Sequence, residues 1–93
     1  MPRSFTSRVC VPANVLISHV DGESVLLNLQ TESYFGLDDV GTRFWHALTT
    51  AESIQAAFAT LSQEFEVDSV ELRQDLEEFL DKLTGQGLLE TQG

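Results

Sequence analysis

The chain has 93 residues and a mass of 10.3 kDa, a length that fits one domain with a modest core and excludes a second domain. Five Lys and Arg residues against fifteen Asp and Glu residues give a formal net charge of −10. This charge disfavours binding to nucleic acid and to anionic membranes, so we expect neither as a partner. The composition is 42% hydrophobic, with six Phe, one Trp and one Tyr, and therefore predicts a folded domain.

Residues 1–12 are predicted to form a flexible N-terminal segment, because Pro2 and Pro12 bracket polar and small residues. The segment lacks the apolar stretch of a signal peptide, and no run in the chain reaches the ~20 apolar residues that cross a bilayer. Cys10 is the only cysteine, so an intrachain disulfide is excluded. We therefore expect a cytoplasmic protein.

A β-hairpin is predicted over residues 15–29, where two short apolar strands flank Asp21-Gly22, a strong two-residue turn signal. The second strand carries two alternating sets of side chains. One set consists of Val25, Leu27 and Leu29, and the other of Leu26 and Asn28. We expect the set of Val25, Leu27 and Leu29 to face the core.

A third strand is predicted from Glu32 to Leu37, with Phe35 and Leu37 facing the core. The hairpin pattern pairs this strand on one side, and the next element is a helix that cannot continue the ladder. Its outer N–H and C=O groups are therefore predicted to be unpaired. Because such an edge can accept an extended peptide as an added strand, we predict a peptide-binding module rather than an enzyme.

Two helices are predicted to follow this strand. Asp38 or Asp39 is expected to cap the first, in which Trp45 lies beside the apolar stripe. Thr49 and Glu52 match a capping box for the second helix, with Thr50 as an alternative cap. The expected stripe of the first helix consists of Val40, Phe44, Ala47 and Leu48, and that of the second of Ile54, Ala57, Phe58, Leu61 and Phe65.

A third, longer helix is predicted from Asp68, which opens a further capping-box match, to the glycines at 85 and 87. Leu88 and Leu89 are expected to return to the core, followed by a short tail. The predicted fold is α+β, with a three-stranded antiparallel meander sheet followed by three helices in a winged-helix-like arrangement. We predict one domain over residues 13–90 and a tail over residues 91–93.

Catalytic chemistry is not indicated by the sequence. The candidates are Cys10, His19, His46 and scattered carboxylates, and none has a supporting motif. The acidic residues around position 77 point in different directions on a helix, so they predict a solvated face rather than a metal site. The six glycines are dispersed and form no phosphate-binding loop. We expect no metal and no cofactor.

An ordered set of short motifs between Val15 and Leu89 resembles the PqqD-like family, the pyrroloquinoline-quinone biosynthesis D proteins and related recognition elements of ribosomally made, modified peptides. Its most similar members are the stand-alone leader-binding proteins of lasso-peptide pathways. The motif residues are Leu27-Asn28, Tyr34-Phe35-Gly36, Leu37-Asp38, Gly41, Trp45, Asp75, Phe79-Leu80, Leu83 and Gly87-Leu88-Leu89.

The resemblance implies that the leader region of a precursor peptide docks as a strand beside the third strand, in a groove walled by the third helix. It also implies partner enzymes, namely a leader peptidase and a cyclase or another modifying enzyme. One flank of the third helix should line the groove, either the flank of Arg73 and Leu80 or that of Asp75 and Lys82. The candidate peptide-binding residues are Glu32, Ser33, Tyr34, Phe35, Gly36, Leu72, Arg73, Asp75, Leu76, Phe79 and Leu80.

Several alternatives remain open at this point. One is a winged-helix DNA-binding regulator, although acidic residues outnumber Arg73 and Lys82 on the third helix and phosphates would repel them. The resemblance also allows a PqqD-type chaperone for a radical-SAM enzyme. A chaperone-like subunit or toxin-system component, and self-association through the edge strand, are further possibilities.

Overall fold

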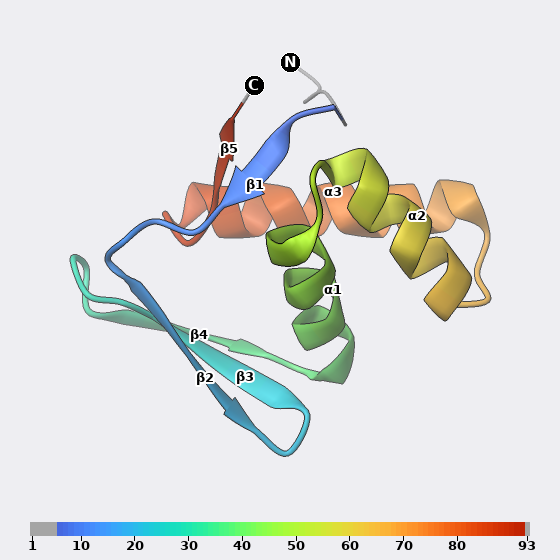
Figure 1. Cartoon of the computed structure of the whole chain (residues 1–93). Helices are drawn as coiled ribbons and strands as arrows, with labels where there is room; N and C mark the ends of the chain where they lie inside the picture. The colour runs from blue at the N-terminus through green and yellow to red at the C-terminus, as the bar shows by residue number, and fades with distance from the viewer. Residues whose placement is uncertain (1–5, 93) are drawn as a thin grey trace.

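The computed structural model describes residues 6–92 of the chain. Figure 1 shows three strands below a layer of helices, with a second, two-stranded sheet where the ends of the chain meet. The elements are β1 (Arg8–Cys10), β2 (Val15–Val20), β3 (Glu23–Asn28), β4 (Ser33–Leu37), α1 (Asp39–Thr50), α2 (Ile54–Glu64), α3 (Ser69–Gly85) and β5 (Glu90–Gln92). The predicted α+β class, with a three-stranded meander followed by three helices, is confirmed.

The main sheet has the antiparallel order β2-β3-β4. The turn between β2 and β3 is the predicted Asp21-Gly22 pair, and both residues have positive φ, 51° and 81°, as a two-residue hairpin turn requires. This turn sets the register, in which Val20 pairs with Glu23 and Val15 with Asn28.

The face of β3 that packs on the helices is opposite to the predicted one. Leu26 and Asn28 are buried, at 0% and 3% exposure, whereas Val25 and Leu29 are 42% and 51% exposed. Leu27 lies on the outer face with Val25 and is half-buried. The prediction was wrong because both faces of β3 carry aliphatic residues, so alternation alone does not identify the core side.

Each helix begins at a side chain that accepts a backbone hydrogen bond. Asp38 Oδ1 accepts from the Gly41 N–H at 2.8 Å before α1, and Asp68 Oδ1 accepts from the Val70 N–H at 2.8 Å before α3, as predicted. The predicted cap of α2 was wrong, because Ser53 Oγ accepts from the Ala56 N–H at 3.1 Å. Thr49 instead belongs to the last turn of α1, where its hydroxyl donates to the Trp45 carbonyl at 2.8 Å.

The core lies between the inner face of the sheet and the three helices. The α3 residues Leu72, Leu76, Leu80 and Leu83 are all at most 2% exposed, and Trp45 of α1 is 5% exposed. Trp45 therefore belongs to the core rather than lying beside it. Val40, predicted in the same stripe, is 45% exposed at the start of α1.

The two-stranded sheet at the chain ends was not predicted. Arg8 pairs with Gln92, and Cys10 with Glu90, so part of the segment expected to be flexible and part of the expected tail form β1 and β5. Val9 is 4% exposed, and the predicted return of the Leu88-Leu89 pair to the core is confirmed at 2% and 1% exposure. Strands of three residues are too short to produce a readable alternation. Residues 1–5 lie outside the described part.

Candidate functional site

The strand β4 is an open edge of the main sheet. Within residues 6–92 its one strand neighbour is β3, with Leu26 opposite Phe35 and Leu27 opposite Tyr34. The backbone groups on the other side of β4 therefore have no strand to pair with in this part of the chain. This confirms the predicted edge, which can accept one further strand.

A groove of about 400 Å³ runs beside this edge, between β4, the start of α1 and α3. Its floor is aromatic and aliphatic, formed by Phe35 and Leu37 of β4, Phe44 of α1 and Phe79 of α3. The rings of Phe44 and Phe79 meet edge to face, with centroids 5.5 Å apart. Because Phe35 and Phe79 are only partly buried, an apolar side chain entering the groove would find exposed ring surface to cover.

The walls of the groove are charged. Asp38 stands at the start of α1, and Asp75, Glu78 and Lys82 line the groove from α3. These α3 positions, with Phe79, follow the i, i+3, i+4, i+7 spacing of one helix face. Among residues 6–92, Asp75, Glu78 and Lys82 take part in none of the ion pairs, which join Arg43 to Asp39 and Glu64, and Arg73 to Glu77.

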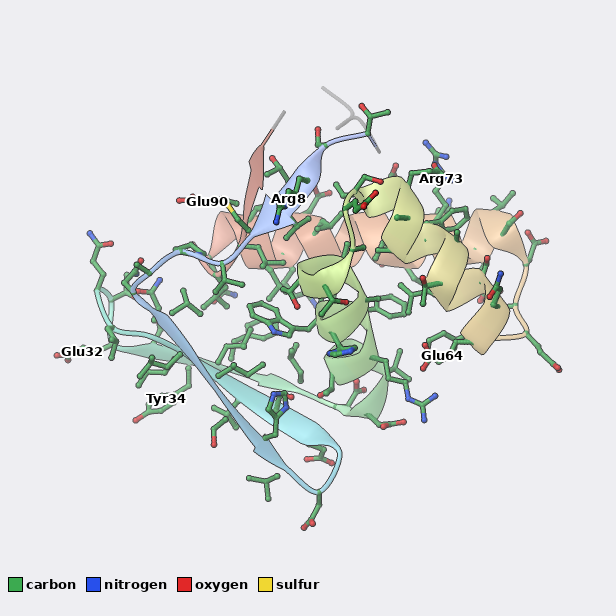
Figure 2. All side chains as sticks on the ribbon, viewed as in Figure 1. Arg8, Glu32, Tyr34, Glu64, Arg73 and Glu90 are labelled. Atoms are coloured by element: carbon green, nitrogen blue, oxygen red, sulfur yellow. The ribbon has the colours of Figure 1, made fainter. Side chains whose placement is uncertain are left out.

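The structure separates the predicted residues of β4 into different environments. Phe35 and Gly36 line the groove, and Ser33 lies at its far end, in a neighbouring polar hollow. Tyr34 is 73% exposed and points away from the helices, as Figure 2 shows. Glu32 precedes β4 and sits in the turn with a φ of 59°.

On α3, the predicted residues divide in the same way. Leu72, Leu76 and Leu80 are at most 2% exposed, so in this structure they belong to the core and present no surface to a peptide. All three are part of the core cluster, and α3 packs against α2. Arg73 lies 3.7 Å from Glu77, away from the groove, and Figure 2 places it on the opposite side of the molecule from Tyr34.

The flank of α3 that lines the groove is therefore the one with Asp75 and Lys82, together with Phe79. On α3, the predicted peptide-binding residues include Asp75 and Phe79 of this lining but not Glu78 or Lys82. The helical spacing from Asp75 would have identified Glu78 and Lys82. The α1 residues that line the groove are Val40, Gly41 and Phe44. The sequence placed them in the first helix but not in the groove, because their position there depends on how α1 packs beside β4.

The outer face of the sheet carries a second exposed surface. Leu16, Leu27 and Tyr34 form a row across all three strands, because Leu16 pairs with Leu27 and Leu27 with Tyr34. Leu16 is 52% exposed, and Val25 of β3 and Leu29, the residue after β3, extend the apolar area. We call these five residues the outer apolar face. Acidic residues lie at its margins: Asp21 and Glu23 at the hairpin end and Glu32 at the other.

A serine, a histidine and a threonine lie close together on the helix-facing side of the sheet. His19 Nδ1 lies 3.1 Å from Ser24 Oγ, which lies 2.9 Å from Thr42 Oγ1. Ser24 is only 3% exposed, so this serine hydroxyl is not presented to a substrate. Within residues 6–92 no three His, Cys, Asp or Glu side chains group closely enough to hold a metal ion, and none of the helices has the length and apolarity to span a membrane.

These features define a small α+β domain whose open edge strand borders an apolar groove with acidic walls. Residues 23–89 match the family described as Coenzyme PQQ synthesis protein D (PqqD), and the chain belongs to this family. No curated protein matches the chain significantly.

Two solved structures share the fold. One is described as TbiB1 in complex with the TbiA(beta) leader peptide; it is 39% identical, with a TM-score of 0.80, over 86% of this chain and 93% of that one. The other is described as lasso peptide synthetase B1 complexed with the leader peptide, at 19% identity and a TM-score of 0.80, over 89% of this chain and 98% of that one. The second likeness establishes the fold alone.

Proposed function

We propose that this chain is a non-catalytic recognition element of a lasso-peptide pathway. It binds the leader region of a ribosomally synthesised precursor peptide by strand addition to β4, and presents the precursor to separate enzymes in the cytoplasm. The observation that carries the proposal is the coincidence of an open strand edge with an apolar groove along the same strand. The 39% identical TbiB1, whose structure contains a leader peptide, supports the same reading.

The energetics require both parts of the site. Four to six backbone hydrogen bonds at a net ~1 kcal/mol each give ~4–6 kcal/mol, which the ~4–15 kcal/mol cost of association can cancel. Each apolar leader side chain buried against the aromatic floor adds ~1.5–3 kcal/mol. Two or three such side chains bring the dissociation constant into the micromolar range or below. The floor formed by Phe35, Phe44 and Phe79 is suited to this role.

A backbone N-methyl scan of the peptide tests strand addition without altering the protein. The probe is the leader region of the precursor encoded beside this gene, titrated calorimetrically as the unmodified peptide and as a set of singly N-methylated peptides. Successive residues of a strand turn their N–H groups to opposite sides. Strand addition therefore predicts that N-methylation weakens binding at every second residue over the docked segment. Absence of binding would contradict the proposed function, and loss without a period of two would contradict strand addition.

The outer apolar face is the surface that we assign to the enzyme partner, a leader peptidase or cyclase. It adjoins β4, so a peptide added to β4 would extend this face with its own outward side chains. Its acidic margin, with Asp21, Glu23 and Glu32, favours a partner whose apolar patch has a basic margin and disfavours pairing between two copies of this chain. Exposed apolar patches of this kind commonly mark protein interfaces.

The Leu16→Glu variant tests this assignment, because Leu16 is 52% exposed and lies on β2, away from the groove. Leader affinity should be unchanged, whereas a leader peptidase that processes the bound precursor should cleave it more slowly. Val70→Glu, a change of the same kind at a 66% exposed residue of α3, is the control. Equal cleavage rates with the two variants would exclude the outer apolar face as the enzyme contact.

A further inference from the structure

The two hollows that border β4 differ in charge. At the end of β4, Asp38, Asp75 and Glu78 line the groove together. At the start of β4, the neighbouring hollow of about 540 Å³ is lined mainly by uncharged residues, among them Ser33 and Gln86, and by a single carboxylate, that of Glu90. A peptide that follows β4 therefore passes from a hollow with one carboxylate to a groove with three carboxylates and one Lys.

The order of charges along the groove follows from the relative directions of α3 and β4. Gly85, at the end of α3, shares the polar hollow with Ser33, at the start of β4. Asp75, two to three turns earlier in α3, shares the groove with Leu37 and Asp38. The two elements thus run in opposite directions, and along α3 Lys82 lies between the polar hollow and the groove carboxylates Asp75 and Glu78.

We infer that the leader segment bound in this groove carries a Lys or Arg two positions from its groove-filling apolar residue, on the side toward the C-terminal end of β4. This inference rests on the proposed function and specifies the peptide that the site selects. Phe79 and Asp75 are four residues apart on α3, about 6 Å along its axis. Alternate residues of a strand are about 6.6 Å apart, so an apolar side chain over Phe79 places the next groove-facing side chain level with Asp75 and Asp38.

The carboxylates are available for such a contact. Asp75 and Glu78 form no ion pair within residues 6–92, and the chain carries a net charge of −10, which would repel an acidic peptide. A basic side chain with its stem over the aromatic floor could place its charge between the two walls. Because these carboxylates are exposed, the expected gain is modest, about fivefold in affinity at low salt and less at 0.5 M salt.

A double-mutant cycle tests the inference. In the leader encoded beside this gene, each Lys or Arg is replaced singly by Gln, and each peptide is titrated against the wild-type protein and against Asp75→Asn/Glu78→Gln. For one of these peptide Lys or Arg residues, located two positions from an apolar residue, the replacement should weaken binding to the wild-type protein about fivefold. The same replacement should leave binding to the double variant unchanged. Glu52→Gln/Glu66→Gln, which makes the same change in net charge at exposed residues outside the groove, should retain the fivefold effect.

The outcomes separate this inference from the proposed function. A leader that binds the wild type, but whose basic residues contribute equally in all three proteins, overturns the inference and leaves the proposed function standing. A leader that binds and contains no basic residue near an apolar one also overturns it. A leader that fails to bind the wild-type protein overturns both.

Discussion

Proline substitution on the two edges of the main sheet should affect peptide binding very differently. Tyr34 on β4 and Ser18 on β2 are both exposed, mid-strand residues, each paired with β3. Only β4 borders the groove. We predict that Tyr34→Pro strongly weakens binding of the leader peptide and that Ser18→Pro does not.

The magnitude follows from the length of β4, which has five residues. An added strand of this length can form about four to six backbone hydrogen bonds with it. Proline removes one N–H, and its ring prevents close approach of the neighbouring backbone. Loss of two to three bonds at ~1 kcal/mol each is ~2–3 kcal/mol, or roughly a 30- to 150-fold higher dissociation constant.

Calorimetric titration of the leader into each variant measures the effect, and circular dichroism with thermal unfolding reports whether the variants keep their helix content. The register places the Ser18 N–H toward β3 and the Tyr34 N–H toward the free edge, so Ser18→Pro should lower the thermal midpoint more than Tyr34→Pro and is the more stringent control. A folded Tyr34→Pro protein with wild-type affinity would refute docking at β4. Equal loss of affinity with Ser18→Pro would mean that the effect arises from general damage to the sheet.

Three further predictions concern stability, measured by urea unfolding. Asn28→Ala should lower the free energy of unfolding by about 2–3 kcal/mol. The Asn28 side chain is 3% exposed, and its Oδ1 accepts hydrogen bonds from Asn14 and from two backbone N–H groups of the β3–β4 turn. A decrease below about 0.5 kcal/mol would contradict this prediction. Gly87→Ala should cost about 1–2 kcal/mol, because φ at this residue is 71°, and a neutral result would show that the turn relaxes. Ser53→Ala should cost about 1 kcal/mol and Thr49→Ala less, because only Ser53 caps α2; the reverse order would restore the cap predicted from sequence.

Local signals in the sequence were sufficient for most elements. The Asp21-Gly22 turn fixes the β2–β3 hairpin because both residues tolerate positive φ. Asp38 and Asp68 mark the starts of α1 and α3 because their side chains accept N–H groups of the first turn. The cap of α2 was misplaced because Thr49, Thr50 and Ser53 are all suitable cap residues, and the choice depends on where α1 ends.

Features that depend on tertiary packing could not be predicted in the same way. β3 is aliphatic on both faces, so its core side is decided by the helices that pack on Leu26 rather than by alternation. The same property explains the error: the set predicted as core forms part of the outer apolar face. On α3 the apolar stripe was visible, but the flank that borders β4 depends on how the helix is rotated over the sheet, which places Asp75 in the groove and Arg73 outside it.

The groove and the outer apolar face meet at β4, so occupancy of one should influence binding at the other. A peptide strand along the five residues of β4 adds a strip of sheet about 17 Å long and 4.8 Å wide, or about 80 Å². If the outward side chains on this strip are apolar, it contributes about 2 kcal/mol to partner docking, a coupling of about 30-fold. Linkage requires the reciprocal effect, so the enzyme partner should tighten leader binding by the same factor. Titrating the leader with and without a catalytically inactive partner measures this, and equal affinities would show that the partner does not contact the added strand.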